Sequence, residues 1–522
     1  MGLKDKVSGS IRNEGSTETT KIEFKKENVV ATECGLNCFP TIYGVDEYLR
    51  LANKIYDDFV TRLNTRETLT EDRVREAMAQ FISNYELPKP YLKEEITDFV
   101  VDNLVYYGPI TTITRHAGED LNDIIVNTKD YIDVIFQGKT HNTNFKYRSE
   151  EELRRVINKM LASCNRKVDE AHPIASGKLT DGSRLEVQVP PIAANMDSDG
   201  NLGSYITIRK FRDVPLLLEQ LIDGNQMNYK MAYFLIKSVQ GKLNTIVSGG
   251  TSSGKTTFLN ALTRFVFEGD QLLTIEDTKE MRPQMPCHSI RSYEGRPPNE
   301  EGVGAINAEH LLRTALRSSP RRIIVGECRG GEIVVMLNAM NTGHPGSMTT
   351  VHADDTREAV VRIENMYLEA RSTANMNFVR QQIISAVDLI VQLIRFPDGS
   401  RKVVKISEPE KRIEEGGIVS IQDIYEFKRT SSEGDVTILR GDFHAAGSPT
   451  RALQKMQENG VEIDKRIFND EFDFNKDMLI NELKAYHPSI MCNWKDEFMI
   501  EIIKGSAIID GNNIIDRWPN LK

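Results

Sequence analysis

The residues best suited to chemistry form a glycine-rich loop near the middle of the chain. Residues 249–257 read GGTSSGKTT, an intact G-x4-GK-[ST] pattern. Glycines let such a loop wrap phosphates with its backbone N–H groups, while the lysine reaches the β- and γ-phosphates and the next hydroxyl is a ligand for Mg²⁺. The pattern predicts a site for ATP and Mg²⁺ built from Gly249, Gly250, Thr251, Ser252, Ser253, Gly254, Lys255, Thr256 and Thr257.

Two acidic residues follow the loop, each at the end of an apolar segment. Glu327 ends segment 321–327, and Glu276 lies near the end of segment 272–277. An acid at the end of a buried strand can hold the Mg²⁺ shell, partly through water, or polarise the attacking water. One such acid alone is more typical of a helix N-cap or a surface ion pair. Together with the loop on one sheet edge, they favour catalysis, with Glu327 and Thr256 predicted as Mg²⁺ ligands.

Two histidines lie in and after a glycine-rich turn beyond Glu327. Residues 342–353 read TGHPGSMTTVHA and contain His344 and His352. Such histidines can donate hydrogen bonds toward phosphate or relay its loss to a moving element, and both are predicted to be catalytic. Cys34 and Cys38 form one C-x3-C pair, but no second pair lies nearby to complete a zinc site, so no zinc is expected.

The elements around these residues alternate between apolar strands and helices. Strands are predicted at 244–250, 272–277, 321–327, 346–353 and 388–394, and a helix follows the loop. This alternation predicts a parallel sheet covered by helices on both faces.

The upstream half of the chain has a different pattern. Residues 43–86 show helical periodicity, and the segment after them mixes helices with strands at 123–127, 131–136, 184–189 and 205–208. The predicted segments are a flexible arm (1–40), a helical segment (41–90), an α+β domain (91–212), a linker and helix (213–240), the P-loop domain (241–400), C-terminal strands and a helix (401–469), and a tail of unknown role (470–522).

Composition limits the class of protein. The 522 residues are 39% hydrophobic and 27% charged, which excludes a mostly disordered chain and a disulfide scaffold. The net charge of −10 weighs against coating of nucleic acid by bulk charge. The N-terminus has no apolar signal segment, and no uncharged apolar run reaches the ~18 residues of a membrane span. A soluble protein is expected.

The motifs together resemble one family. A Walker A segment, an aspartate box (TIEDTKEM), a Walker B segment (RSSPRRIIVGECRGGE) and a histidine box (NAMNTGHPGSMTTVHAD) occur in the order seen in the secretion-superfamily ATPases of type II and type IV secretion and type IV pili. The nearest subgroup is the tight-adherence (Flp) pilus-assembly ATPases, with conjugation-type secretion ATPases close by. Segments 106–110, 168–191, 206–211 and 441–461 also resemble that subgroup, so the likeness runs from about 45 to 468.

This resemblance implies a fold and site roles. The fold class is α/β: a RecA-like P-loop motor domain with a parallel sheet, preceded by an α+β N-terminal domain and a helical N-terminal segment. Nucleotide would lie between the two domains, where Arg184 and Arg209 match N-terminal arginines that approach it. The resemblance places Walker, aspartate-box and histidine-box roles on Lys255, Thr256, Glu276, Glu327, His344 and His352. Arg291 and Arg296 are further candidates.

The resemblance also implies partners. The chain is expected to form a homohexamer that docks from the cytoplasm onto a polytopic inner-membrane platform protein, without stable nucleic-acid binding. The leading hypothesis is an ATP-hydrolysing motor that powers assembly of a pilus or transport of a substrate through a secretion machine. An ATP-binding scaffold with little turnover and a RecA-like nucleic-acid motor are the alternatives. The intact Glu276 and Glu327 favour turnover, and the acidic charge balance disfavours a nucleic-acid motor.

Overall fold

The computed structural model describes residues 8–11, 20–23, 40–63, 69–118, 121–136, 138–210, 215–267, 269–284, 289–298, 302–415, 417–430 and 440–486. The chain divides into two compact units, residues 1–213 and 214–522. Within the predicted N-terminal arm, β1 (Ser8–Ile11) and β2 (Thr20–Glu23) pair antiparallel. The rest of the arm up to residue 39, and residues 487–522 of the predicted tail, lie outside the described residues.

The described residues of the first unit form an antiparallel sheet with the order β5-β4-β3-β8-β7-β6. The strands predicted at 123–127, 131–136, 184–189 and 205–208 are confirmed with small shifts at their ends. The strands are β3 (Leu121–Thr128), β4 (Tyr131–Phe136), β5 (Lys139–Asn142), β6 (Ile174–Lys178), β7 (Arg184–Gln188) and β8 (Tyr205–Arg209).

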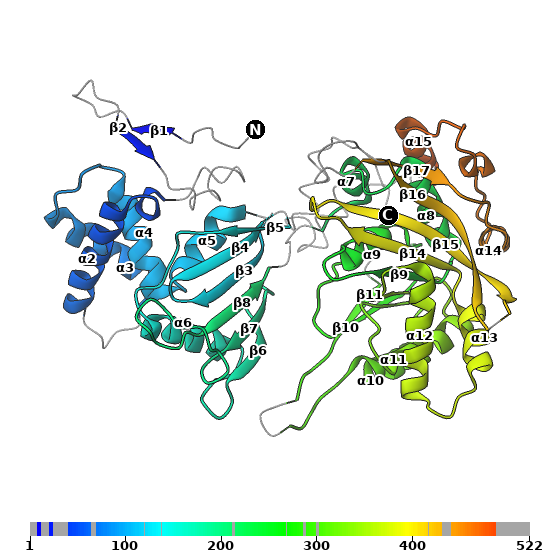
Figure 1. The fold of residues 1–522 in the computed structure, drawn as a ribbon, viewed down its shortest axis with the longest axis horizontal. Helices are drawn as coiled ribbons and strands as arrows, with labels where there is room; N and C mark the ends of the chain where they lie inside the picture. Colours follow the sequence, from blue (N-terminus) through cyan, green and yellow to red (C-terminus); the bar gives the residue numbers. More distant parts are fainter. Residues whose placement is uncertain are drawn as a thin grey trace. The chain divides into compact units, whose positions relative to one another are not determined.

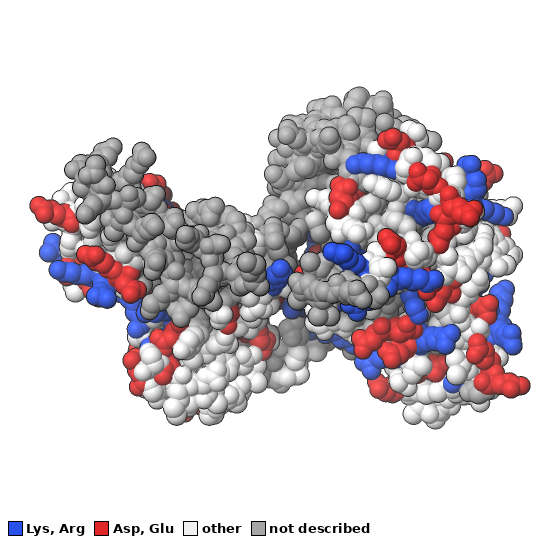
Figure 2. Space-filling model, turned by 45° about the horizontal axis from the view of Figure 1, so that its top comes forward, with Lys and Arg blue, Asp and Glu red and all other residues white. Residues whose placement is uncertain are grey.

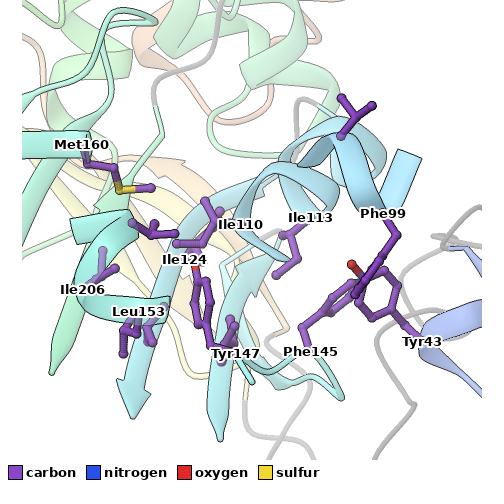
Figure 3. Close-up of a cluster of buried hydrophobic side chains, with 14 of the residues drawn as sticks. Tyr43, Phe99, Ile110, Ile113, Ile124, Phe145, Tyr147, Leu153, Met160 and Ile206 are labelled. Carbon is purple, nitrogen blue, oxygen red and sulfur yellow. The ribbon is translucent and has the colours of Figure 1, made fainter. Parts of the chain in front are cut away.

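The helices of the first unit share one apolar core with this sheet. Figure 3 shows Tyr43, Phe99 and Phe145 meeting in this core, with the ring centroids of Tyr43 and Phe145 4.3 Å apart. The helical segment predicted at 41–90 therefore belongs to the same core as the α+β segment. The helices are η2 (Thr41–Tyr43), α2 (Asp46–Arg62), α3 (Glu71–Phe81), η3 (Ile82–Asn84), α4 (Leu92–Val105), α5 (Pro109–Ala117) and α6 (Glu150–Ser163).

In the described part of the second unit, one sheet has the order β11-β10-β12-β13-β9-β14-β15-β16-β17 (Figure 1). Neighbours from β11 to β14 pair parallel, and those from β14 to β17 pair antiparallel. The strands are β9 (Thr245–Gly249), β10 (Leu272–Glu276), β11 (Ile290–Glu294), β12 (Arg322–Val325), β13 (Met348–Val351), β14 (Leu389–Arg395), β15 (Arg401–Ile413), β16 (Val419–Arg429) and β17 (Gly441–Ala445).

Helices cover both faces of the parallel strands, as predicted. Consecutive strand residues alternate between two cores: Val247 packs in one and Ile246 in the other. The first core is covered by α7 (Leu218–Asp223), α8 (Tyr229–Gln240), α9 (Lys255–Leu262), η5 (Thr263–Phe265), α14 (Arg451–Glu458), η7 (Lys465–Phe468) and α15 (Lys476–Tyr486). The second is covered by α10 (Ala308–Ala315), α11 (Glu332–Asn341), α12 (Thr356–Ala370) and α13 (Met376–Ala386), with η6 (Leu316–Ser318) after α10.

The C-terminal strands continue the parallel part of the sheet in the second unit. β15 pairs with β14 next to the P-loop strand, so segments 241–400 and 401–469 form one layer. Part of the predicted tail also packs here, since Phe474 and Leu479 are buried in the core with α8. The edge strand β11 escaped prediction because it is short and its side chains are mostly half-buried, without a clear alternation.

A buried asparagine joins three strands at the amino ends of the parallel sheet. Asn244 Oδ1 accepts hydrogen bonds from Gly346 N (2.8 Å) and Ser347 N (3.2 Å), which lead into β13. Its Nδ2 donates to Ala386 O (2.7 Å), before β14, and to Met340 O (3.3 Å). One amide side chain therefore satisfies four backbone groups that water does not reach.

None of the helices in the described ranges is long and apolar enough to cross a membrane.

We expect Asn244→Ala to lower the free energy of unfolding of the second unit by about 2–4 kcal/mol, because it leaves buried backbone groups without partners. Urea unfolding followed by circular dichroism measures this, and the transition that ATP shifts identifies the second unit. Asn365→Ala, at an exposed position of α12, is the matched control and should change stability by less than about 0.5 kcal/mol. Equal effects of the two substitutions would contradict the role given to Asn244.

Candidate nucleotide site

The parallel register brings the predicted site residues from distant segments to one edge of the sheet. Lys255 follows β9, Glu276 ends β10, Glu327 follows β12 and His352 follows β13. Because these strands are parallel neighbours, their carboxyl ends meet at the same edge. Ligands of open α/β sheets bind at this edge.

Close packing dictates the residue types of the phosphate loop. A Cβ on Gly249 would lie 2.4 Å from Leu393 O and 2.6 Å from Ser253 Oγ, so no side chain fits there. Gly254 has φ +93°, and Ser252 has φ +59°, a left-handed value that non-glycine residues seldom adopt. The loop leads into α9, whose first residue is Lys255.

Lys255 is held in a largely buried position by its own loop. Its Nζ donates to Gly249 O (2.8 Å) and Gly250 O (2.9 Å), and the residue is 8% exposed. Burial lowers the pKa of the ammonium from about 10.5 to about 8, against the opposing influence of the Glu327 carboxylate. A phosphate that approached this ammonium would find a positive charge with little water around it.

A chain of polar side chains links Lys255 to Glu327. Lys255 Nζ lies 3.4 Å from His352 Nδ1, and His352 Nε2 lies 2.8 Å from Glu327 Oε1. Since an ammonium only donates, Nδ1 must accept, which leaves the imidazole proton on Nε2. Glu327 Oε1 nevertheless is buried without a hydrogen-bond partner among the described residues, so the contact with Nε2 is close but not aligned as a hydrogen bond. Burial and then the Lys255 charge lower the pKa of His352, in keeping with a neutral ring. Arg329 Nη2 binds the other carboxylate oxygen of Glu327 at 2.6 Å.

Glu276 points its carboxylate into the turn that follows β10. Its Oε1 accepts from Glu280 N (3.1 Å) and Met281 N (3.0 Å). Its side chain also packs on Gly326, where an added Cβ would lie 2.9 Å from Glu276 Cγ. In this structure Glu276 therefore shapes the edge beside Glu327, and its predicted catalytic role stays a prediction.

The structure does not bring His344 to this edge. Its Nδ1 lies 2.9 Å from Pro320 O, and both residues precede the parallel strands β12 and β13. They therefore lie at the amino ends of these strands, opposite the phosphate loop. Two histidines eight residues apart are separated in this way because a strand runs between them.

The predicted arginines of the first unit form a pair on adjacent strands. Arg184 begins β7 and Arg209 ends β8, and the strand register places them directly opposite one another. Arg209 Nε also binds Asp123 Oδ1 at 3.1 Å. Like charges placed opposite each other are unfavourable unless an anion lies nearby. Of the other candidates, Arg291 lies on the edge strand β11 and Arg296 donates to Gly304 O at 2.7 Å.

Sequence reasoning missed Arg329 and Arg401. Arg329 stands two residues after Glu327, and this close spacing to an acid was an available signal. Arg401 Nε donates to Ser252 O in the phosphate loop at 3.0 Å, from 149 residues farther along the chain. Such a contact has no signal in the local sequence.

The residue types at this edge suit Mg²⁺. Thr256 supplies a hydroxyl and Glu327 a carboxylate, the oxygen ligands this ion prefers. Within the described ranges, no group of three or more His, Cys, Asp or Glu residues could hold a metal ion.

The chain is similar to several known proteins. The family described as type II/IV secretion system protein matches residues 110–440. A protein of Mycobacterium tuberculosis named as a conjugal transfer protein is 29% identical over 297 residues, which cover 56% of this chain and 81% of that protein. The type IV secretion system protein VirB11 of Bartonella henselae is 27% identical over 348 residues, covering 60% and 94%. The solved structure of the Yersinia pseudotuberculosis ATPase DotB matches 72% of this chain and 89% of that one, at 17% identity and a TM-score of 0.42.

The lowered pKa of Lys255 predicts a pH-dependent stability of the nucleotide-free protein. Between about pH 8 and about pH 10.5 the unfolded chain holds a proton on Lys255 that the folded chain has released. The penalty for burying the ammonium is therefore complete below about pH 8 and is relieved as the pH rises through this window. Thermal unfolding of wild type and Lys255→Met from pH 7 to 10.5 measures this. The wild type should gain stability relative to the variant as the pH rises, and a constant difference would contradict the assignment.

Proposed function

The chain belongs to the type II/IV secretion system protein family and is an ATPase motor of pilus or secretion machinery, and we propose that it works as a homohexameric ring whose chemistry lies at the carboxyl edge of the motor sheet. The observation that carries this proposal is the polar chain of Lys255, His352, Glu327 and Arg329 beside the phosphate loop. This polar chain links Lys255, the group that binds phosphate, with Glu327, the acid suited to activate water.

Each residue of the edge has a role in this proposal. The backbone N–H groups of the loop and the Lys255 ammonium bind the nucleotide phosphates, and Thr256 and Glu327 hold Mg²⁺. When bound, Mg²⁺ neutralises charge on the transferred phosphoryl group. Glu327 accepts a proton from the attacking water, and the His352 imidazole lies next to that carboxylate, with Nε2 2.8 Å from Oε1. Glu276 keeps the neighbouring turn in place and is proposed to act on the γ-phosphate side.

Completion of the site by the first unit is the second part of the proposal. Arg184 and Arg209 lie at the end of the sheet from which the chain continues toward the second unit. An arginine that reaches the γ-phosphate stabilises charge on the transferred group, an effect worth 10³–10⁵ where such arginines are known. Approach of these arginines to nucleotide would couple hydrolysis to domain movement.

Partners and location are a further part of the proposal. We propose docking at the cytoplasmic face of the inner membrane on a polytopic platform protein. Figure 2 shows blue and red side chains interspersed on the visible face of the second unit, without the single-sign surface typical of nucleic-acid binding.

Glu327→Gln should retain ATP binding and slow hydrolysis at least ~100-fold, because the amide keeps the shape of the side chain and loses the proton acceptor. Phosphate release and binding of a fluorescent ATP analogue measure the two steps. Lys255→Ala is the companion variant and should lose tight binding as well as turnover. Wild-type protein without ATP turnover would contradict the proposed function. Unchanged turnover in Glu327→Gln, with loss in Glu276→Gln, would exchange the roles of the two acids.

Arg209→Ala should bind ATP, hydrolyse it slowly and fail to compact when a non-hydrolysable analogue is added. Small-angle scattering of wild type and variant, each with and without the analogue, measures compaction. Lys139→Ala, at an exposed cation that begins β5 at the edge of the same sheet, is the control and should behave as wild type. Equal compaction of wild type and Arg209→Ala, with normal turnover, would leave Arg209 as a surface charge.

A further inference from the structure

The hairpin between β14 and β15 has a tightly built turn. Phe396 N donates to Ser400 O at 2.8 Å, and both Ser400 N and Ser400 Oγ donate to Asp398 Oδ1, at 2.9 and 2.7 Å. Gly399 takes φ +85°, which glycine adopts without steric cost. These bonds determine where the chain leaves the turn, and the next residue is Arg401.

This turn lies beside the phosphate loop. β14 pairs parallel with β9, and Leu393 is the register partner of Gly249, the first residue of the loop motif. The two backbones approach so closely that a Cβ on Gly249 would meet Leu393 O at 2.4 Å. The hairpin and the loop therefore leave the sheet side by side at its carboxyl edge.

Arg401 makes two contacts that bear on the shape of the loop. Its Nε donates to Ser252 O at 3.0 Å, and Ser252 holds the left-handed φ of +59°. Its aliphatic stem covers Gly254, where a Cβ would lie 3.1 Å from Arg401 Cδ. One side chain thus binds the carbonyl of the strained residue and packs on the glycine that precedes Lys255.

We propose that Arg401 is a positioning residue for nucleotide binding, which holds the phosphate loop in its binding conformation through the Ser252 carbonyl. The proposal rests on the proposed nucleotide site and adds to it a residue outside the Walker, aspartate-box and histidine-box segments.

The physical reason is preorganisation. The loop binds phosphate through N–H groups whose directions depend on backbone dihedral angles, and Ser252 is held at a left-handed dihedral that a residue with a Cβ seldom adopts. Without the hydrogen bond from Arg401, the loop can relax, and nucleotide binding must then order it again. We propose that the loop binds the nucleotide equally in the ground state and the transition state, in which case the loss falls on KM and spares kcat.

The test compares Arg401→Met with Arg412→Met. Methionine keeps much of the aliphatic stem and removes the donors, and Arg412 is an exposed arginine farther along the same strand. We expect Arg401→Met to raise KM for ATP and the dissociation constant of a fluorescent ADP analogue about tenfold, the effect of one hydrogen bond from a charged donor. Its kcat should stay within about twofold of wild type, and Arg412→Met should match wild type in all three quantities.

Arg401→Lys separates geometry from charge. Lysine keeps the charge without the Nε donor and should leave KM clearly raised. An unchanged KM in Arg401→Met, a loss confined to kcat, equal shifts in both methionine variants, or full recovery by lysine would each overturn the proposal. If Arg401→Met fails to fold, the KM of Arg401→Lys decides alone. Failure of the proposed function is distinct, because it would show as absent ATP turnover in the wild type.

Discussion

A parallel sheet buried on both faces leaves its strand ends as the place where polar side chains can gather, and this constraint organises the second unit. The sheet lies between two apolar cores, and successive strand residues pack alternately in one core or the other. Charged groups accordingly gather beyond the carboxyl ends, where Lys255, Glu327 and His352 meet. The amino ends are joined by Asn244, whose amide replaces water for four backbone groups.

The charged side chains at the carboxyl edge have partners within the same edge. The Lys255 ammonium is satisfied by two loop carbonyls, and the Glu327 carboxylate lies between His352 and Arg329. The two carbonyl oxygens that hold Lys255 are partners that a phosphate oxygen can replace. Binding of an anion here therefore rearranges existing pairs, which suits a site that must bind and release in each cycle.

The antiparallel strands after β14 also contribute to the nucleotide site at the carboxyl edge. Through the β14–β15 turn they place a side chain on the phosphate loop from outside the parallel sheet. A loop with a left-handed conformation at Ser252, a residue with a Cβ, is costly to hold by its local sequence alone. The surrounding strands supply the contacts that make this conformation stable.

The sequence by itself determined the nucleotide loop, the alternation of strands and helices, and the acids at strand ends, because these signals are local in spacing and periodicity. It also predicted β3, β4, β7 and β8 of the first unit from their alternating residues. Tertiary structure decided which site residues meet. His352 lies beside Glu327, whereas His344 lies at the opposite end of β13. The carboxylate of Glu276 accepts hydrogen bonds from backbone amides. Arg401 contacts Ser252 across 149 residues of sequence, and only strand register and packing bring the two together. Contacts between such distant segments depend on the order of strands in the sheet, and no local sequence pattern encodes that order.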